Sequence, residues 1–277
     1  MKKALKELKN KITKIKKPKK ISDKVWRDFV DKTTIVLMAG GESSRFSEVT
    51  KGNPVNKNAF RLPNGDSMIE MTIRMYKAAG FKNFVALVFH NATSIEEILA
   101  DGTGLGVKIK YSYDPEIPVG KGGAIKNAIL NLSIPKEHYC IIHNPDDVIV
   151  DFVGSFPRHI VEGHIYGKRS LATVVVVEET PYTYTGMKII NNVVHQIEMY
   201  PQIPIPTHIG VTILSPGTYS YFDKYFDLKK KADFESVLFP ILAKRKLLGA
   251  VSIPSNCWIA VNNAKSYKEL VKRLGKK

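Results

Sequence analysis

Apolar residues between positions 33 and 143 alternate between short continuous runs and helical periodicity. The run 33–39 has the length of one buried strand and leads directly into two glycines, as the first strand of many α/β domains does. Later strands are predicted at 83–89, 107–112 and 139–143, and helices at 68–79, 93–100 and 121–132. These repeated strand-then-helix units predict an α/β fold with a mostly parallel central sheet and helices on both faces.

The second half of the chain also alternates, with more strands. A β-branched run at 171–178 is too continuous for a strand with one exposed face, so we expect it inside the same sheet. Asn191 and Asn192 suit a two-residue hairpin turn between short strands at 187–190 and 193–198. The pattern adds strands at 208–214 and 249–254 and helices at 234–244 and 264–274. We therefore expect one domain over 33–277, preceded by a basic extension over 1–32.

The bulk composition is that of an ordinary globular protein, with 277 residues, of which 44% are hydrophobic and 25% charged. No apolar run approaches the roughly 18 residues of a membrane span, and lysines stand where a secretory signal has its apolar stretch. We therefore expect a cytoplasmic protein. Cys140 and Cys257 lie far apart without metal-binding spacing, so we expect two buried thiols.

The positive charge is concentrated at the N-terminus. Residues 1–20 hold ten lysines and one glutamate, which account for +9 of the formal charge of +16. The rest of the chain is only mildly basic, so we expect no nucleic-acid partner. An apolar stripe at helical spacing runs through this segment at Leu5, Leu8, Ile12 and Ile15. The stripe favours packing on the chain's own domain or on a second copy in a homo-oligomer, while contact with a membrane surface or another protein stays open.

A loop of small residues follows the first predicted strand, with the sequence AGGESSR at 39–45. Residues without large side chains let main-chain N–H groups approach phosphate oxygens, and serine hydroxyls add further donors. An arginine guanidinium can hold two oxygens at once. The loop therefore suits a triphosphate. Its candidate ligands are Ala39, Gly40, Gly41, Ser43, Ser44 and Arg45.

Three segments of the chain carry a family resemblance. They read LMAGGESSRF at 37–46, NKNAFRL at 56–62 and GDSMIE at 65–70. They resemble the signature L-A-G-G-x-G-T-R-L, P-K-x-L-L-P-V and G-K-P-M-I-E of the sugar-1-phosphate nucleotidyltransferases. The resemblance implies the Rossmann-like nucleotide-diphospho-sugar transferase fold, and a reaction of a nucleoside triphosphate with a sugar 1-phosphate that releases pyrophosphate. It also implies that Lys57 binds the nucleotide phosphates and is catalytic together with Arg45.

The segment before the third predicted helix is similar to the part of the family that faces the nucleobase. Residues 118–124 read PVGKGGA where the family has P-L-G-T-A-G-A, which implies nucleotide contacts at Gly120 and Gly122. Asp114 and Glu116 precede this helix, and a carboxylate can accept from both N–H groups on the edge of guanine. Glu116 is therefore a candidate base ligand. This choice favours a mannose-1-phosphate guanylyltransferase slightly over a glucose-1-phosphate uridylyl- or thymidylyltransferase.

An acidic pair follows the strand predicted at 139–143. Residues 144–147 read NPDD and resemble the N-G-D of the family. Phosphate transfer develops negative charge, which is commonly neutralised by Mg²⁺ held by one or two carboxylates and by substrate oxygens. The resemblance implies that Asp146 is the magnesium ligand. Asp147 is the alternative if the proline shifts the turn.

A second family metal ligand is replaced in this chain. Residues 258–262 read WIAVN where the family has W-x-D-I-G, so Ala260 stands in the place of a metal-binding aspartate. A methyl group cannot bind a metal. Asn262 or Asn263 could supply an amide oxygen instead, as in the V-N-N of the related N-acetylglucosamine-1-phosphate uridylyltransferases, and Asn262 is the candidate metal ligand.

The sugar pocket of the family is matched only in part. YTG at 184–186 is similar to its tyrosine-glycine pair, and EMYP at 198–201 stands at its E-K-P. The residues implied as sugar contacts are Tyr184, Gly186 and Glu198. Met199 replaces the lysine that holds the sugar phosphate, which leaves Lys188 as an alternative cation.

The expected mechanism is in-line attack of a sugar phosphate oxygen on the α-phosphorus, in which positioning and charge neutralisation carry the rate. Two other classes stay open. A homologue that binds nucleotide sugars without turnover is favoured by Ala260 and Met199. A glycosyltransferase that uses nucleotide sugars on a related fold is disfavoured, because that class has no need of the glycine-arginine loop.

Overall fold

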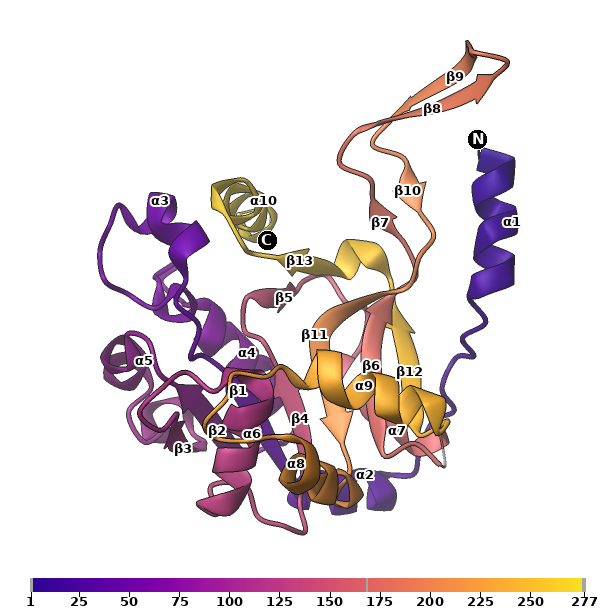
Figure 1. Cartoon of the computed structure of the whole chain (residues 1–277). Helices are drawn as coiled ribbons and strands as arrows, with labels where there is room; N and C mark the ends of the chain where they lie inside the picture. Colours follow the sequence, from indigo (N-terminus) through magenta and orange to yellow (C-terminus); the bar gives the residue numbers. More distant parts are fainter. Residues whose placement is uncertain (1, 168, 276–277) are drawn as a thin grey trace.

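A seven-stranded sheet runs through the centre of the computed structural model, which describes residues 2–167 and 169–275 (Figure 1). Its strands are β1 (Thr33–Met38), β2 (Asn83–Val88), β3 (Lys108–Tyr113), β4 (Tyr139–His143), β6 (Ala172–Val177), β11 (Thr207–Leu214) and β12 (Leu248–Ile253). They lie in the order β12-β6-β11-β4-β1-β2-β3. β11 is antiparallel to both neighbours, and all other pairings in this sheet are parallel. The predicted mostly parallel sheet is confirmed.

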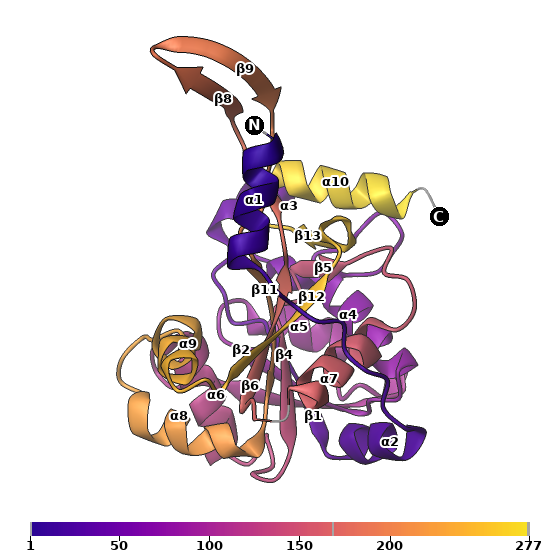
Figure 2. The ribbon, with the colours of Figure 1, turned by 90° about the vertical axis from the view of Figure 1, so that its right-hand side faces the viewer.

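Helices cover both faces of this sheet (Figures 1 and 2). They are α2 (Asp23–Asp31), α4 (Met68–Ala78), α5 (Ala92–Leu99), α6 (Gly120–Leu130), α7 (Phe156–Tyr166), α8 (Tyr219–Tyr225) and α9 (Phe234–Lys244). Apolar side chains of α2, α4, α5 and α7 pack in one core, and those of α6, α8 and α9 pack in another. Ile35 and Leu37 of β1 belong to the first core and Val36 to the second, since successive strand residues face opposite sides.

A smaller apolar cluster lies beyond one end of the sheet. It joins short elements from distant parts of the chain, namely α3 (Ser47–Thr50), β5 (Asp147–Ile149), β13 (Trp258–Ala260) and α10 (Ala264–Leu274). Phe46, Val148, Ile259 and Leu270 are buried in this cluster. β5 and β13 pair antiparallel. This packing brings the segment after β4 next to the C-terminal part of the chain.

Every helix and strand predicted between 33 and 143 is present, with its ends within about two residues, but the pattern missed the short helix α3. The run at 171–178 forms β6, which lies between β12 and β11 and is buried throughout. The pattern missed α7, in which Pro157 and Gly163 interrupt the helical periodicity. Proline is tolerated in a first helical turn, and an added Cβ at Gly163 would overlap Val251. Close packing, rather than helix propensity, explains that glycine.

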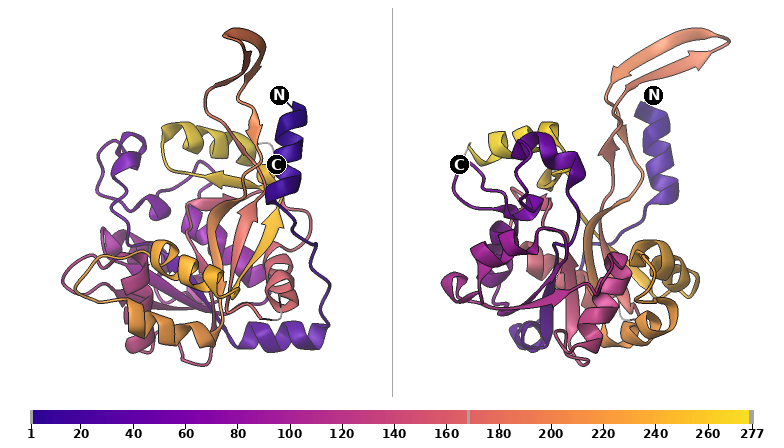
Figure 3. Two further views of the ribbon diagram at one scale, coloured as in Figure 1. Left: turned by 45° about the vertical axis from the view of Figure 1, so that its right-hand side comes forward. Right: turned by 60° about the vertical axis from the view of Figure 1, so that its left-hand side comes forward.

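The predicted hairpin is confirmed and projects from the body of the molecule (Figures 1 and 3). Its strands are β8 (Thr185–Ile190) and β9 (Val193–Met199). Asn191 (φ 48°) and Asn192 (φ 66°) both adopt the left-handed conformation that a two-residue type I′ turn requires. The hairpin is joined to the body by a second short pair, β7 (Thr180–Pro181) with β10 (Gln202–Ile203).

The N-terminal segment begins with helix α1 (Lys2–Ile12), so the fourth residue of the predicted stripe, Ile15, lies beyond the helix. Lys9 joins α1 to Glu178 and Glu179 by ion pairs of 3.3 and 3.4 Å. Helix α2 follows and buries Phe29 and Val30 in the main core. No helix within 2–167 or 169–275 has the length and apolar character to cross a bilayer. Both cysteines are buried thiols, as predicted.

Candidate active site

A cleft of about 730 Å³ lies beside the carboxyl ends of β1 and β4. Ligands of open α/β sheets bind at this edge, because the loops that follow the strands meet there. The predicted residues that the cleft brings together are Gly40, Gly41, Ser43, Ser44, Arg45, Lys57, Gly120, Asp146 and Asn262. The predicted residues that do not line it are Ala39, Glu116, Gly122, Tyr184, Gly186 and Glu198.

The loop after β1 exposes its main chain to the cleft. Ser43 adopts a left-handed conformation (φ 61°) and precedes one 3₁₀ turn, Ser44–Phe46. Its Oγ accepts a hydrogen bond from Lys57 N at 3.3 Å and donates to Gly41 O at 3.4 Å. Phe46 is buried and packs edge-on against Tyr267. The loop is therefore anchored at one end by an aromatic core residue, and Ser43 ties it to the segment that carries Lys57.

Asn56 links the end of β1 to the lysine segment and was missed by sequence reasoning. Its Nδ2 donates to Ala39 O at 2.7 Å and to His90 O at 3.2 Å, and its Oδ1 accepts from Asn58 N at 3.0 Å. Only 1% of Asn56 is exposed. The carbonyl oxygen of Ala39 accepts this hydrogen bond from Asn56, so Ala39 fixes the start of the loop and does not line the cleft. The available sequence signal was an asparagine, a common helix cap, directly before Lys57.

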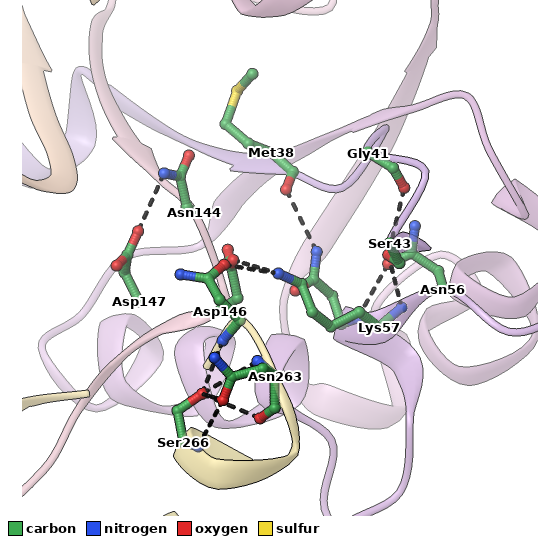
Figure 4. A network of polar contacts seen from close by, with 12 residues as sticks. Met38, Gly41, Ser43, Asn56, Lys57, Asn144, Asp146, Asp147, Asn263 and Ser266 are labelled. Atoms are coloured by element: carbon green, nitrogen blue, oxygen red, sulfur yellow. Dashed lines mark hydrogen bonds and ion pairs between the residues drawn. The ribbon is translucent and has the colours of Figure 1, made fainter. Parts of the chain in front are cut away.

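Lys57 and Asp146 face each other in the cleft (Figure 4), and Asn262 contacts the same lysine. Lys57 Nζ lies 2.5 Å from Asp146 Oδ2 and 3.4 Å from Asn262 Oδ1. The side chains of the ion pair are only 14% and 20% exposed, so the contact is largely shielded from water. Three residues that are far apart in the sequence thus place one positive group between two oxygen ligands.

The adjacent carboxylate, Asp147, points away from this group. Its Oδ1 accepts from Trp258 Nε1 at 2.9 Å, and its Oδ2 accepts from Asn144 Nδ2 at 3.1 Å. Burial, and then the nearby charge of Asp146, raise the pKa of Asp147 to about 7. Gly210 (φ 71°) permits this arrangement, because a Cβ there would overlap the Asp147 carboxylate. These contacts hold Asp147 in the interior, so Asp146, and not Asp147, lines the cleft.

A buried histidine supports the turn that carries the two aspartates. His143 Nε2 lies 3.0 Å from the main-chain oxygen of Asp147, and its Nδ1 lies 3.0 Å from the Tyr76 hydroxyl. Since a carbonyl only accepts, Nε2 carries the proton and Tyr76 donates to Nδ1. Burial lowers the pKa of His143 to about 4, so the ring is neutral at pH 7. His143 therefore has a structural role in this turn.

The loop between β13 and α10 holds Asn262 in place. Val261 N donates to the main-chain oxygen of Asp146 at 2.8 Å. Asn262 N donates to Ser266 Oγ at 3.0 Å, and Asn263 caps α10 by accepting from Ser266 N. Ala260, two residues before Asn262, pairs with Asp147 between strands β13 and β5. Asn262 therefore places an amide in the cleft, two residues after Ala260, which has no carboxylate.

The first turn of α6 forms another wall of the cleft. Gly120 (φ 73°) lies against the main chain of Ala232, where no Cβ would fit. Gly122 faces Phe226 instead, and an added Cβ would overlap its ring. Asp114 lines the cleft and accepts from Val119 N at 3.2 Å, whereas Glu116 is exposed outside it. Burial raises the pKa of Asp114.

Some of the cationic side chains that line the cleft form ion pairs, and others do not. Lys57 and Lys121 are paired, with Asp146 and Glu235 respectively. Arg45 and Lys231 have no hydrogen-bond or ion-pair partner within the described ranges. Sequence reasoning missed Lys231, although the lysine run at 229–231 was a visible signal. The unpaired cations are available to an anionic ligand.

The predicted sugar residues lie on or beside the projecting hairpin. Tyr184 is 69% exposed, and Gly186 pairs with Glu198 across β8 and β9. Lys188, the alternative cation for the sugar phosphate, belongs to the same hairpin. The structure does not bring these residues to the cleft.

The oxygen donors at the convergence point suit a hard cation. Asp146 offers a carboxylate and Asn262 an amide oxygen, and both face the position that the Lys57 ammonium takes. Mg²⁺ is commonly bound by one or two protein oxygens, with water and substrate phosphates completing its octahedron. Among the described residues, no three His, Cys, Asp or Glu side chains cluster as a metal cage. A site that shares its metal with a substrate therefore fits better than an all-protein cage.

The fold and the cleft define an α/β protein of the class that takes up phosphorylated ligands at the carboxyl ends of its strands. The chain belongs to the nucleotidyl transferase family, whose model matches residues 34–276. This match confirms the family predicted from the motifs. Comparison with curated protein sequences finds no match.

Solved structures share the fold across most of their length. A protein of Bacillus anthracis assigned as a glucose-1-phosphate thymidylyltransferase has a TM-score of 0.67 and 17% identity, covering 87% of this chain and 94% of that one. HddC from Yersinia pseudotuberculosis has a TM-score of 0.63 and 20% identity, with coverages of 87% and 99%. A UDP-glucose pyrophosphorylase complexed with UDP-glucose has a TM-score of 0.65 and 16% identity, covering 88% of this chain and 98% of that one. These likenesses confirm the predicted Rossmann-like fold.

Proposed function

We propose that this chain condenses a nucleoside triphosphate with a sugar 1-phosphate to give a nucleotide sugar and pyrophosphate. The observation that carries the proposal is the convergence of Lys57, Asp146 and Asn262 beside the glycine-serine loop in one cleft. A cation, two oxygen donors and exposed main-chain amides are the groups that a polyphosphate with a divalent ion needs. Membership of the nucleotidyl transferase family supports the same reaction class.

In the proposed reaction, a phosphate oxygen of the sugar 1-phosphate attacks the α-phosphorus. The new P–O bond forms as the bond to the β-phosphate breaks, and pyrophosphate leaves with the electron pair. Main-chain amides at Gly40 and Gly41 and the Arg45 guanidinium bind the β- and γ-phosphates, and Lys57 neutralises charge at the α-phosphate. Asp146 and Asn262 would hold Mg²⁺, which would supply further charge neutralisation.

In the absence of substrate, the Lys57 ammonium contacts the oxygens of Asp146 and Asn262 that would hold Mg²⁺. The 2.5 Å ion pair between Lys57 and Asp146 keeps both groups oriented in a largely dry site. Arrival of a triphosphate would give Lys57 a new anionic partner and free the Asp146 carboxylate, which would then be able to hold Mg²⁺. The ion pair thus pre-organises the two groups for the charges that they later meet.

For the nucleobase we propose guanine, with Asp114 as the acceptor of its N–H groups. Asp114 lines the cleft beside Gly120, whereas Glu116, chosen from the sequence, lies outside it. A carboxylate accepts from both N–H groups of guanine but repels the acceptor oxygens of uracil and thymine. Asp114→Asn is expected to weaken use of GTP and to improve use of UTP or dTTP, and unchanged preference would contradict this role.

For the sugar phosphate we propose Lys231 as the cation that replaces the missing family lysine. Lys231 lines the cleft, whereas Met199 and Lys188 lie on the hairpin outside it. Lys231→Ala is expected to raise KM for the sugar 1-phosphate by roughly 10-fold or more, as loss of a charged hydrogen bond does, with a smaller change in KM for the triphosphate. Lys230→Ala is the neighbouring control. The roles predicted for Tyr184, Gly186 and Glu198 stay predictions.

The test of the reaction itself is a substrate panel with detection of released pyrophosphate. GTP, UTP, dTTP and CTP are each combined with mannose 1-phosphate and glucose 1-phosphate in the presence of Mg²⁺. Pyrophosphate release that requires both substrates, together with a nucleotide sugar identified by mass spectrometry, supports the proposal.

A second candidate is a homologue that binds nucleotide sugars without turnover. It is favoured by Ala260, since the aspartate of the family is absent from β13. Calorimetric binding of a nucleotide sugar with no pyrophosphate release from any pair in the panel would select this function. Binding and release together would remove it.

A further inference from the structure

The projecting hairpin carries an uncovered apolar face. Residues directly opposite each other in an antiparallel pair lie on the same face of a ribbon. Thr185 with Met199 and Met187 with Ile197 are such pairs on one face, whereas Lys188 pairs with Gln196 on the other. Exposed fractions on the apolar face range from 46% to 63%, at Met187, Ile189, Val194, Ile197 and Met199. We call this set the ribbon face.

A bulge keeps the ribbon face continuous up to the turn. The register shifts after Lys188, so that Ile189 pairs with Val194 and His195 becomes the extra residue. Without this shift Ile189 would lie opposite His195. A lone two-stranded ribbon is marginally stable in water, so an apolar face built in this way needs a cover.

Helix α1 offers a second uncovered apolar surface at the same end of the molecule (Figures 1 and 3). Leu5, Leu8 and Ile12 share one side of the helix, and Leu8 and Ile12 are 37% and 47% exposed. Eleven helical residues span about 16 Å, and the seven residues of β9 span about 23 Å. The helix is therefore short enough to lie along the ribbon.

We propose that a second copy of this chain covers these surfaces, with α1 of each copy packed on the ribbon face of the other. A two-fold axis makes such an exchange reciprocal, so both apolar surfaces of both copies are buried. Charge does not oppose this pairing, because α1 carries five lysines and one glutamate, whereas residues 185–199 of the ribbon carry one lysine and one glutamate. Contact between two α1 helices would instead oppose like charges.

An anionic membrane is the rival occupant, and the ribbon argues against it. β8 and β9 form a sheet of two strands only, so each strand has one edge of unpaired main-chain groups. These groups need water, which the interior of a bilayer does not provide. A protein partner can cover the ribbon face and leave both edges hydrated.

The first test measures the oligomeric state of the full chain by sedimentation equilibrium over a range of concentrations. We expect a dimer for the unchanged chain and at least 10-fold weaker association for Ile197→Glu and for Met187→Glu. Gln196→Glu adds the same charge on the polar face and is expected to leave the dimer intact. The ribbon stands outside the buried cores, so circular dichroism should show all three variants folded.

The second test identifies the contact by disulfide formation. A Leu8→Cys chain is mixed with an Ile197→Cys chain under mild oxidation, and we expect a covalent heterodimer between the two. The native Cys140 and Cys257 are buried, so the unchanged chain is the background control. A monomer at all concentrations, or an Ile197→Glu variant that associates normally, would overturn the proposal. Binding of monomeric chain to phosphatidylserine vesicles that Ile197→Glu abolishes would also overturn it, in favour of the membrane. None of these readouts depends on the proposed activity.

Discussion

Trp258 Nε1 donates a hydrogen bond of 2.9 Å to Asp147 Oδ1, and this contact separates the tasks of two adjacent carboxylates. The indole and the Asn144 amide hold Asp147 in the interior. Asp146, one residue earlier, is left to face Lys57 across the cleft. The separation is visible in their surroundings, since burial raises the pKa of Asp147 to about 7.

Asp146→Asn and Asp147→Asn should have opposite signatures. Loss of the Asp146 charge removes the proposed metal ligand, so kcat is expected to fall roughly 10²–10³-fold, as for other groups that stabilise transition-state charge. Asparagine at 147 can keep a buried polar contact with Trp258, so its kcat is expected to change much less. Steady-state pyrophosphate release measures both. Equal losses in the two variants would show that the roles are not divided.

Lys57→Ala is expected to lower kcat/KM by orders of magnitude and leave the fold intact. The ammonium is the group that faces the α-phosphate in the proposed reaction, and its removal leaves developing charge unbalanced. Lys110→Ala, which removes an exposed lysine from the outer strand β3, is the matched control. Near-normal turnover in Lys57→Ala would refute the assignment of this residue.

Asn262→Asp is expected to lower the Mg²⁺ concentration that gives half-maximal activity. A carboxylate binds a hard cation more strongly than an amide oxygen does, and residue 262 already faces the Asp146 side of the cleft. Asn262→Leu should shift the same titration to higher Mg²⁺. Chelation of the metal should stop turnover in all three forms. Identical magnesium titrations would exclude Asn262 as a ligand.

Acidification should destabilise the protein below about pH 6.5. Burial lowers the pKa of His143 and His164 from 6.5 to about 4, so each binds its proton more readily when the chain is unfolded. Their contribution to stability is therefore present above pH 6.5 and is lost as the pH falls toward 4. Asp147 acts oppositely, because its pKa is raised from 3.8 to about 7 and its contribution is lost as the pH rises through that range.

Two histidines outweigh one aspartate between pH 4 and 6.5. The unfolded state then binds about one proton more, so the free energy of unfolding should fall by about 1.4 kcal/mol per pH unit on acidification. Urea titrations at several pH values measure this slope. His164→Gln removes one histidine away from the cleft and is expected to flatten it. A slope of opposite sign in the unchanged chain would contradict the account.

Gly122→Ala and Gly41→Ala distinguish packing from ligand binding. A Cβ at Gly122 would overlap Phe226, so we expect a loss of about 1–3 kcal/mol in the free energy of unfolding. Phe226→Leu in the same chain should recover part of the loss. A Cβ at Gly41 meets nothing within 4 Å, so stability should hold while KM for the triphosphate rises. A stable Gly122→Ala protein with weak nucleotide binding would restore the role predicted from sequence.

The glycine-serine loop at 39–45 and the turn at 144–147 were predictable because each follows a buried strand. Continuous apolar runs identified β1 and β4, and the carboxyl ends of parallel strands lie at one edge of a sheet. Helix α7 and the hydrogen bonds of the Asn56 side chain were not predictable. Gly163 of α7 is required by close packing against Val251, and the Asn56 amide donates to the main-chain oxygens of Ala39 and His90. These contacts join distant residues, so no local sequence pattern predicts them.

The sequence by itself determined the mostly parallel sheet and the family, because buried strands leave continuous apolar runs and the family motifs are short local segments. Only the tertiary structure decided which of two neighbouring aspartates faces the cleft, since that choice depends on Trp258, more than one hundred residues away in the chain. It likewise decided that Gly122 serves packing and that Asp114, rather than Glu116, lines the cleft. The direction of a side chain is set by neighbours that meet it only after folding.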